Sequence, residues 1–189
     1  MKNYLSISKK IKPFKKSLEI EGDKSLSIRW ALMASQATGT STSRNLLRSE
    51  DVLNTLNCLK ELGLKVKLKK KTCKIISTGL NSFNLKKKII LNAGNSATLG
   101  RLIMGLLVHY NSNVKIIGDK SLSKRDFLRI IKPLKKFGAK FVSNNGKLPI
   151  KITGTKLSKP IRYFENKGSA QCKSAVMLAA LNTKGKTLI

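Results

Sequence analysis

The six residues Gly22-Asp23-Lys24-Ser25-Leu26-Ser27 occur twice, because the same six letters return at positions 118–123. An arginine stands two positions after each copy, as Arg29 and as Arg125. A six-residue self-match in a chain of 189 residues indicates repeated units. Each copy sets a glycine, a lysine, two hydroxyls and an arginine ahead of a helix-like pattern, which suits an anion site at a helix N-terminus. The repeat therefore predicts a protein that binds small anions.

The hydrophobic pattern recurs in the order helix, strand, helix, two strands. Leu59 to Lys65 and Leu134 to Lys140 have similar sequences and end two of the helices at Gly63 and Gly138. We expect a short strand at 17–20 before the first copy and another at 187–189, where the chain ends. The expected helices start at Ser27 and Ser49 and span 95–109, 127–137 and 169–181; the expected strands are 40–45, 64–68, 73–78, 88–91, 113–117, 139–143 and 148–152.

The charge of the chain favours anionic ligands. Lys and Arg number 39 against 9 Asp and Glu, a formal charge of +30. Nucleic-acid binding is the alternative that such a balance raises. The lysines are spread along the whole chain, however, and aromatic residues make up only 5% without interleaving with basic ones. Lysine-rich composition is therefore the favoured explanation, and nucleic acid is not an expected partner.

Cysteine and histidine usage limits the chemistry. The three cysteines are widely spaced without a C-x-x-C pair, so we expect neither a disulfide framework nor a metal site, and a reducing cytoplasm fits. His109, the single histidine, ends an apolar run and is interpreted as a helix C-terminal residue. The basic N-terminus lacks the apolar core of a signal peptide, and no apolar run is long enough to cross a membrane.

Four segments place small residues, hydroxyls and amides at the start of a predicted helix. They could be ordinary capping residues, but four in one chain, two of them with both Lys and Arg, favour a shared anion site. The four segments are 24–29, 94–101, 120–125 and 168–174.

From Gly22 to its end the chain resembles the N-terminal part of the 5-enolpyruvylshikimate-3-phosphate synthase (3-phosphoshikimate 1-carboxyvinyltransferase) family. The residues that carry the resemblance are Gly22-Asp23-Lys24-Ser25 with Arg29, Gly94-Asn95-Ser96-Ala97-Thr98 with Arg101, Gly118-Asp119 with Arg125, Leu148-Pro149, and Ser169-Ala170-Gln171 with Lys173-Ser174-Ala175. The resemblance implies an α/β (α+β) fold: one of two globes, each made of three βαβαββ units. It also implies transfer of the carboxyvinyl group of phosphoenolpyruvate to the 5-hydroxyl of shikimate 3-phosphate, releasing phosphate, with no cofactor.

The same resemblance implies roles for particular residues. Lys24 would be catalytic and would lie between the two substrates. Ser25, Arg29, Ser169, Ala170 and Gln171 would hold shikimate 3-phosphate, and Asn95, Ala97, Arg125 and Gln171 would line the phosphoenolpyruvate pocket. Within the fold, the UDP-N-acetylglucosamine enolpyruvyl transferases are the nearest alternative, but they have Lys-Asn where this chain has Lys24-Ser25.

Ala97 also resembles the glyphosate-tolerant class, since most of the family has glycine there. One added methyl would narrow a pocket that must admit the longer inhibitor, so we expect the complete enzyme to tolerate glyphosate.

The resemblance assigns residues 1–21 to a strand region of the other globe, and 22–189 to the substrate-binding globe with its third unit truncated. The second globe, which carries the general base in the family, would be missing, so we expect this chain alone to be inactive. The alternative function is that of an inactive basic fragment, which associates with a separately encoded second half or with polyanions.

Overall fold

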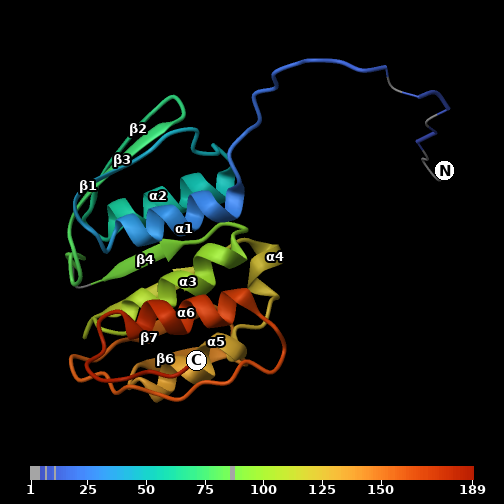
Figure 1. The fold of residues 1–189 in the computed structure, drawn as a ribbon. Coiled ribbons are helices and arrows are strands. Elements are labelled where there is room, and N and C mark those ends of the chain that lie inside the picture. Colours follow the sequence, from blue (N-terminus) through green and yellow to red (C-terminus); the bar gives the residue numbers. More distant parts are fainter. Residues whose placement is uncertain (1–4, 7, 11, 86–87) are drawn as a thin grey trace.

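The computed structural model describes residues 5–6, 8–10, 12–85 and 88–189. Two β-sheets lie on the outside of this part, with helices packed beneath them (Figure 1). The helices are α1 (Lys24–Ala34), α2 (Glu50–Glu61), α3 (Ala97–Leu107), α4 (Lys120–Ser123), α5 (Leu128–Lys136) and α6 (Ala170–Ala180). The strands are β1 (Thr38–Ser43), β2 (Lys65–Lys69), β3 (Thr72–Thr78), β4 (Ile89–Asn92), β5 (Asn113–Ile117), β6 (Lys140–Asn144) and β7 (Lys147–Thr153).

The first sheet is antiparallel, in the order β1-β3-β2. Its hairpin β2–β3 forms where alternating apolar residues predicted it. In β2 the residues Val66 and Leu68 are half-buried, whereas the three lysines between and beside them are exposed. Period-two patterning thus fixes which face of this edge strand meets the core.

The second sheet has the order β4-β5-β7-β6 and shows the complete unit. Strands β4 and β5 are parallel and are connected through α3, and the β6–β7 hairpin then pairs antiparallel with β5. A further unit starts after β7, because Arg162 and Leu188 form a parallel bridge on either side of α6. Arg162 precedes α6 and Leu188 follows it, just as β4 precedes α3 and β5 follows it. The repeated unit is therefore βαβαββ.

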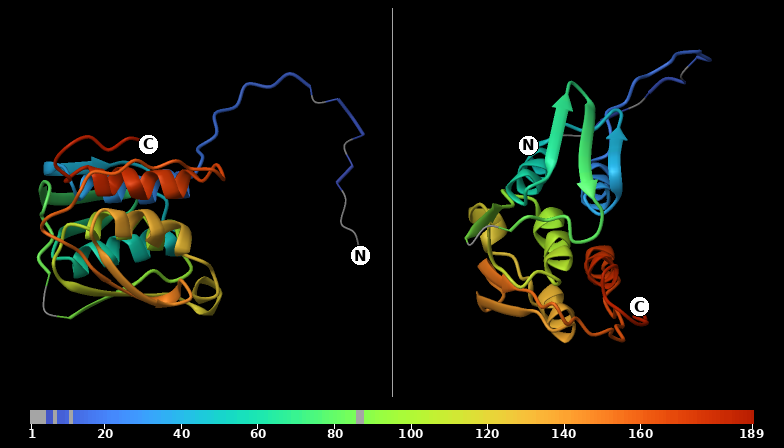
Figure 2. Two further views of the ribbon diagram at one scale, coloured as in Figure 1. Left: turned by 90° about the horizontal axis from the view of Figure 1, so that it is seen from below. Right: turned by 90° about the vertical axis from the view of Figure 1, so that its left-hand side faces the viewer.

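Helix α3 is the centre of the core and is buried on almost every side. In the right-hand view of Figure 2 the helices are seen roughly end-on, with the two sheets outside them. Helix α6 packs closely on α3 at Gly105, where a Cβ atom would lie only 2.3 Å from the carbonyl oxygen of Ala175. The bare backbone at Gly105 therefore sets the spacing of these two helices.

Four sequence-based expectations are corrected. Residues 17–20 form no strand, and no strand lies beside them; the chain leads away from the globe here (Figure 1). The strand expected at 187–189 is reduced to the single bridge of Leu188. Helix α1 starts at Lys24 rather than Ser27 because Asp23 caps it. The second copy of the repeat forms the one-turn helix α4, separate from α5. Of the 1–21 segment, residues 1–4, 7 and 11 lie outside the described residues.

Candidate functional site

A polar cavity of about 360 Å³ lies where the N-terminal ends of four helices meet. Lys24 is the first residue of α1, Ala97 the first of α3, and Gln171 the second of α6. Helix N-termini carry unpaired N–H groups and the positive end of the helix dipole, so the cavity favours anions. Its lining residues are Lys24, Asp51, Asn95, Ala97, Thr98, Arg125 and Gln171.

Side-chain caps fix the starts of α1, α3 and α6, and that of the neighbouring α4, whereas Ser49 before α2 makes no capping hydrogen bond. Asp23 accepts a hydrogen bond from the Leu26 amide at 2.7 Å, and Asp119, at the equivalent position of the second copy, accepts one from Leu122 at 2.6 Å. Ser96 and Ser169 cap α3 and α6 in the same way. The hydroxyls and carboxylates that made these segments conspicuous in the sequence are therefore used to orient the backbone around the cavity.

Lys24 is paired with a carboxylate in this structure. Its ammonium Nζ lies 3.2 Å from Oδ2 of Asp51, in the first turn of α2. The Lys24 side chain remains 56% exposed, and pairs this exposed are weak. An anion entering the cavity can therefore compete for the lysine.

Gln171 is held by two neighbours. Its amide Nε2 donates to the Thr98 hydroxyl at 2.9 Å, and its Oε1 accepts a hydrogen bond from Nη1 of Arg101. Arg101 also donates to the backbone oxygen of Asp126 at 3.3 Å and lies over the Phe127 ring at 5.5 Å. Burial, together with the charge of Arg125, lowers the pKa of Arg101. Arg101 therefore connects α3 to α6 and to the loop that carries Arg125.

Arg29 points into a neighbouring hollow rather than into the cavity. Its Nη1 donates to the Ser174 hydroxyl at 2.6 Å, across the groove between α1 and α6. This hollow, of about 210 Å³, is otherwise mostly apolar and is lined by Arg29, Leu32, Met33, Leu102, Ser174, Met177 and Leu178.

The structure thus brings five of the nine predicted site residues to one cavity. Four of the nine are not lining residues: Arg29, Ser25, Ser169 and Ala170. Ser25 is half-buried in the first turn of α1, and Ser169 and Ala170 stand at the start of α6, where the Ser169 hydroxyl is used as the cap. The five that meet are Lys24, Asn95, Ala97, Arg125 and Gln171.

Sequence reasoning missed Asp51, Thr98 and Arg101. Thr98 and Arg101 belong to a motif that was recognised, but nothing in the letters linked them to Gln171, about 70 residues away. Asp51 lies in the first turn of α2, where an acidic residue is common for the stability of the helix alone. Its approach to Lys24 depends on how α1 packs on α2, which no local pattern encodes.

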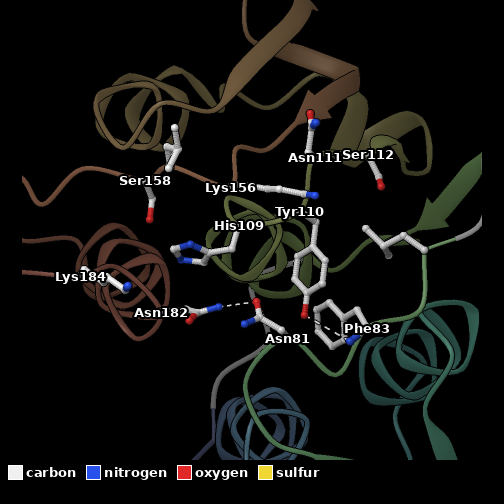
Figure 3. A pocket seen from close by; sticks show the side chains of 12 residues that line it. Asn81, Phe83, His109, Tyr110, Asn111, Ser112, Lys156, Ser158, Asn182 and Lys184 are labelled. Carbon is white, nitrogen blue, oxygen red and sulfur yellow. Dashed lines mark hydrogen bonds between the residues drawn. The ribbon is translucent and has the colours of Figure 1, made fainter.

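A larger hollow of about 600 Å³ lies at the other end of α3 and α6 (Figure 3). His109 lies in its wall just after α3, as its position in the sequence predicted, with Nε2 2.6 Å from the Ala179 oxygen. Burial lowers the pKa of His109 and so favours the neutral ring. Lys156 and Lys184 add positive charge, but both are exposed, and helix C-termini disfavour anions. The N-terminal cavity is therefore the better anion site.

Among residues 5–6, 8–10, 12–85 and 88–189, no three His, Cys, Asp or Glu side chains are grouped to hold a metal ion. In the same part of the chain, no helix has the length and apolar character needed to span a membrane.

Comparison with known proteins assigns the family. The family profile of EPSP synthase (3-phosphoshikimate 1-carboxyvinyltransferase) matches residues 8–189. The 3-phosphoshikimate 1-carboxyvinyltransferase of Ruthia magnifica is 43% identical over 173 residues, which are 91% of this chain and 39% of that protein. The enzyme of the same name from Paramagnetospirillum magneticum is 38% identical over 184 residues, 96% of this chain and 41% of its own.

Solved structures agree. An EPSP synthase structure from Acinetobacter baumannii superposes with a TM-score of 0.84 at 35% identity, covering 90% of this chain and 39% of that one. The chain thus spans about two fifths of the length of the relatives it matches, and the match is to one incomplete globe of mixed α/β structure. On sequence and fold together, the chain belongs to the EPSP synthase (3-phosphoshikimate 1-carboxyvinyltransferase) family.

Proposed function

We propose that this chain forms the shikimate 3-phosphate-binding wall of an enzyme of the shikimate pathway that makes the precursor of aromatic amino acids. The enzyme transfers the carboxyvinyl group of phosphoenolpyruvate to the 5-hydroxyl of shikimate 3-phosphate and releases phosphate, by addition and then elimination. The observation that carries this proposal is the meeting of Lys24, Arg125 and Gln171 in one cavity at the helix N-termini. Each substrate brings a phosphate and a carboxylate, which such a cavity suits.

In this proposal Lys24 exchanges Asp51 for substrate and neutralises phosphoenolpyruvate as charge develops. Arg125 clamps its phosphate with the forked geometry that lysine lacks. Gln171 reaches both substrates from α6, and Asn95 and Ala97 form the wall. Ser25, Arg29, Ser169 and Ala170 hold shikimate 3-phosphate, which requires Arg29 to share or release Ser174.

The proposal makes this chain one side of a cleft. Among the described residues, Asp51 is the one carboxylate that lines the cavity, and it is already paired with Lys24, so in this proposal the general base comes from elsewhere. A second globe, in the same or a separate chain, supplies it and closes over both substrates. Residues 1–21 belong to that globe and 22–189 to this one. We place the protein in the cytoplasm, which its three unpaired, buried cysteines support.

Binding of shikimate 3-phosphate to the chain, followed by calorimetry at fixed salt, tests the proposal. We expect weak binding that Lys24→Ala abolishes and that the matched control Lys65→Ala, on exposed β2, leaves unchanged. The chain alone should not release phosphate from phosphoenolpyruvate; adding the second globe should restore release. Binding equally weakened by both variants, or steeply salt-dependent binding to unrelated nucleic acid, would instead favour a polyanion-binding fragment.

Glyphosate tolerance is a separate part of the proposal. Ala97, the first residue of α3, lines the cavity, and its methyl group takes space that glycine would leave open. In the complete enzyme, Ala97→Gly should make phosphate release more sensitive to glyphosate. Unchanged inhibition in that variant would remove Ala97 as the cause.

A further inference from the structure

The segment that leads into α6 is anchored by a buried carboxylate. The side chain of Glu165 is only 4% exposed. Oε1 accepts hydrogen bonds from Nη2 of Arg129 at 2.9 Å and from the Lys167 amide at 3.0 Å, and Oε2 accepts one from the Tyr163 hydroxyl. In a chain with nine acids and 39 basic residues, a carboxylate this buried and this well satisfied points to a specific task.

The Tyr163 amide, which donates to the Leu188 oxygen at 2.9 Å, anchors the chain before Glu165, but the residues between Glu165 and Ser169 are exposed. Phe164 is 86% exposed, and Lys167 and Gly168 are exposed too. Gly168 has φ of +64°, and a Cβ atom added there would touch nothing within 4 Å. The backbone between Glu165 and Ser169 is therefore free of packing constraints, and Ser169 starts α6 directly after it. The Glu165 contacts are what tie this approach to α5.

Glu165 also sets the charge beside the cavity. Arg129 and Arg125 both lie close enough to Arg101 to lower its pKa, so three cations share this corner. The Glu165 carboxylate, 2.9 Å from Nη2 of Arg129, offsets one of these three charges. Without the carboxylate, an unpaired cation would remain beside the Arg101 that holds Gln171.

We propose that Glu165 is a positioning residue: by fastening the segment before α6 to Arg129 of α5, it holds the start of α6 in place, with Gln171 in the cavity and Ser169 and Ala170 next to it in the chain. The claim rests on the proposed function, because it gives Ser169–Gln171 a substrate to bind. Glu165 itself touches no substrate in this arrangement.

The test is a double-mutant cycle of Glu165→Gln and Arg129→Gln, with shikimate 3-phosphate affinity as the readout. Glu165→Gln should weaken binding about fivefold to tenfold, in the range for losing one ordinary hydrogen bond. The double variant should be no weaker than Glu165→Gln alone. Glu61→Gln, which removes an exposed acid at the end of α2, is the matched control and should bind as the parent chain does.

Amide hydrogen exchange supplies a second readout that does not need a ligand. In Glu165→Gln the amides of Cys172 and Lys173, in the first turn of α6, should exchange at least severalfold faster, whereas the Leu26 amide of α1 should not change. A purely global loss of stability would accelerate both turns together and would overturn the proposal. Tyr163→Phe provides a milder variant should Glu165→Gln fail to fold.

The two proposals fail in different ways. If the parent chain does not bind shikimate 3-phosphate, the proposed function fails, and unchanged exchange at Cys172 and Lys173 in Glu165→Gln would then also overturn the positioning role. If the parent chain binds but Glu165→Gln binds equally well, the positioning role alone is wrong.

Discussion

The ammonium of Lys24 and the carboxylate of Asp51 lie 3.2 Å apart in the lining of the candidate site. The two residues begin neighbouring helices, so each is held by a different element. A substrate anion that binds Lys24 must therefore displace the Asp51 carboxylate, which already pairs with the lysine in the ligand-free protein.

Replacing that carboxylate should strengthen anion binding. In Asp51→Asn, Lys24 keeps its position but loses its partner, so shikimate 3-phosphate should bind more tightly, about fivefold at most for an exposed pair. The gain should shrink as salt is added. Calorimetry at two salt concentrations measures it, with Glu61→Gln correcting for the change in net charge. Weaker binding in Asp51→Asn would mean that the carboxylate helps to bind the ligand.

Arg101 should be intolerant of lysine. Arg101→Lys keeps the charge but cannot reach Gln171 and Asp126 together while lying over Phe127. We expect a loss of about 1–2 kcal/mol in the free energy of unfolding, measured by urea denaturation. Arg48→Lys, at an exposed position, should cost much less. Equal effects of the two substitutions would contradict the role given to Arg101.

The close approach of α6 to α3 at Gly105 gives a steric prediction. A methyl at Gly105 would lie 2.3 Å from the Ala175 oxygen, which is backbone and cannot rotate away. Gly105→Ala should therefore destabilise the chain by about 1–3 kcal/mol or more, despite the better helix propensity of alanine. At Gly100, in the same helix, the added methyl would lie 3.4 Å from a carbon of Phe127. Gly100→Ala should be nearly neutral in the same urea titration.

Acid should loosen the segment before α6. Hydrogen bonds, first that of the Tyr163 hydroxyl, lower the pKa of Glu165 from 4.5 to about 2. A carboxylate whose pKa is lowered by folding stabilises the protein fully above its unfolded value, and this contribution is lost as the pH falls through the folded value. The groups that face Glu165 are Arg129 of α5, Tyr163 and the Lys167 amide of the segment itself, and Cys172 of α6.

The stability difference between the parent chain and Glu165→Gln should therefore be constant above pH 4.5 and shrink between pH 4.5 and 2. Urea midpoints at a series of pH values measure it. Because both chains share every other carboxylate, the subtraction isolates Glu165. A difference that disappears already above pH 4.5 would show that its pKa is not lowered.

The sequence predicted the local structure well where the hydrophobic periodicity agrees with the residues that typically end helices and strands. Strand β5 matches the expected range at both ends, and the helices that end before Gly63 and Gly138 form as expected. The strand expected at 17–20 does not form, because a strand requires a partner and the letters do not say whether one is present. The second repeat copy splits from α5 because Asp126 accepts the Leu128 amide at 2.7 Å and starts a new helix.

The residues of the candidate site were likewise predictable from the sequence only in part. Lys24, Asn95 and Gln171 could be found because they belong to motifs at helix starts. Asp51, Arg101 and Glu165 could not, because their roles depend on which side chains packing brings together across the fold. Arg29 shows the same limit: its position on α1 was predictable, but its bond to Ser174 was not.

The alternation in β2 has a consequence for the behaviour of the protein at high concentration. This strand ends its sheet, so its outer backbone groups are available to a strand of another molecule. Lys65, Lys67 and Lys69 stand exposed along it, and a second copy arriving edge to edge would bring its own three lysines beside them. Because like charges repel, these lysines oppose edge-to-edge association of two copies. Part of the lysine excess therefore acts against self-association of the protein.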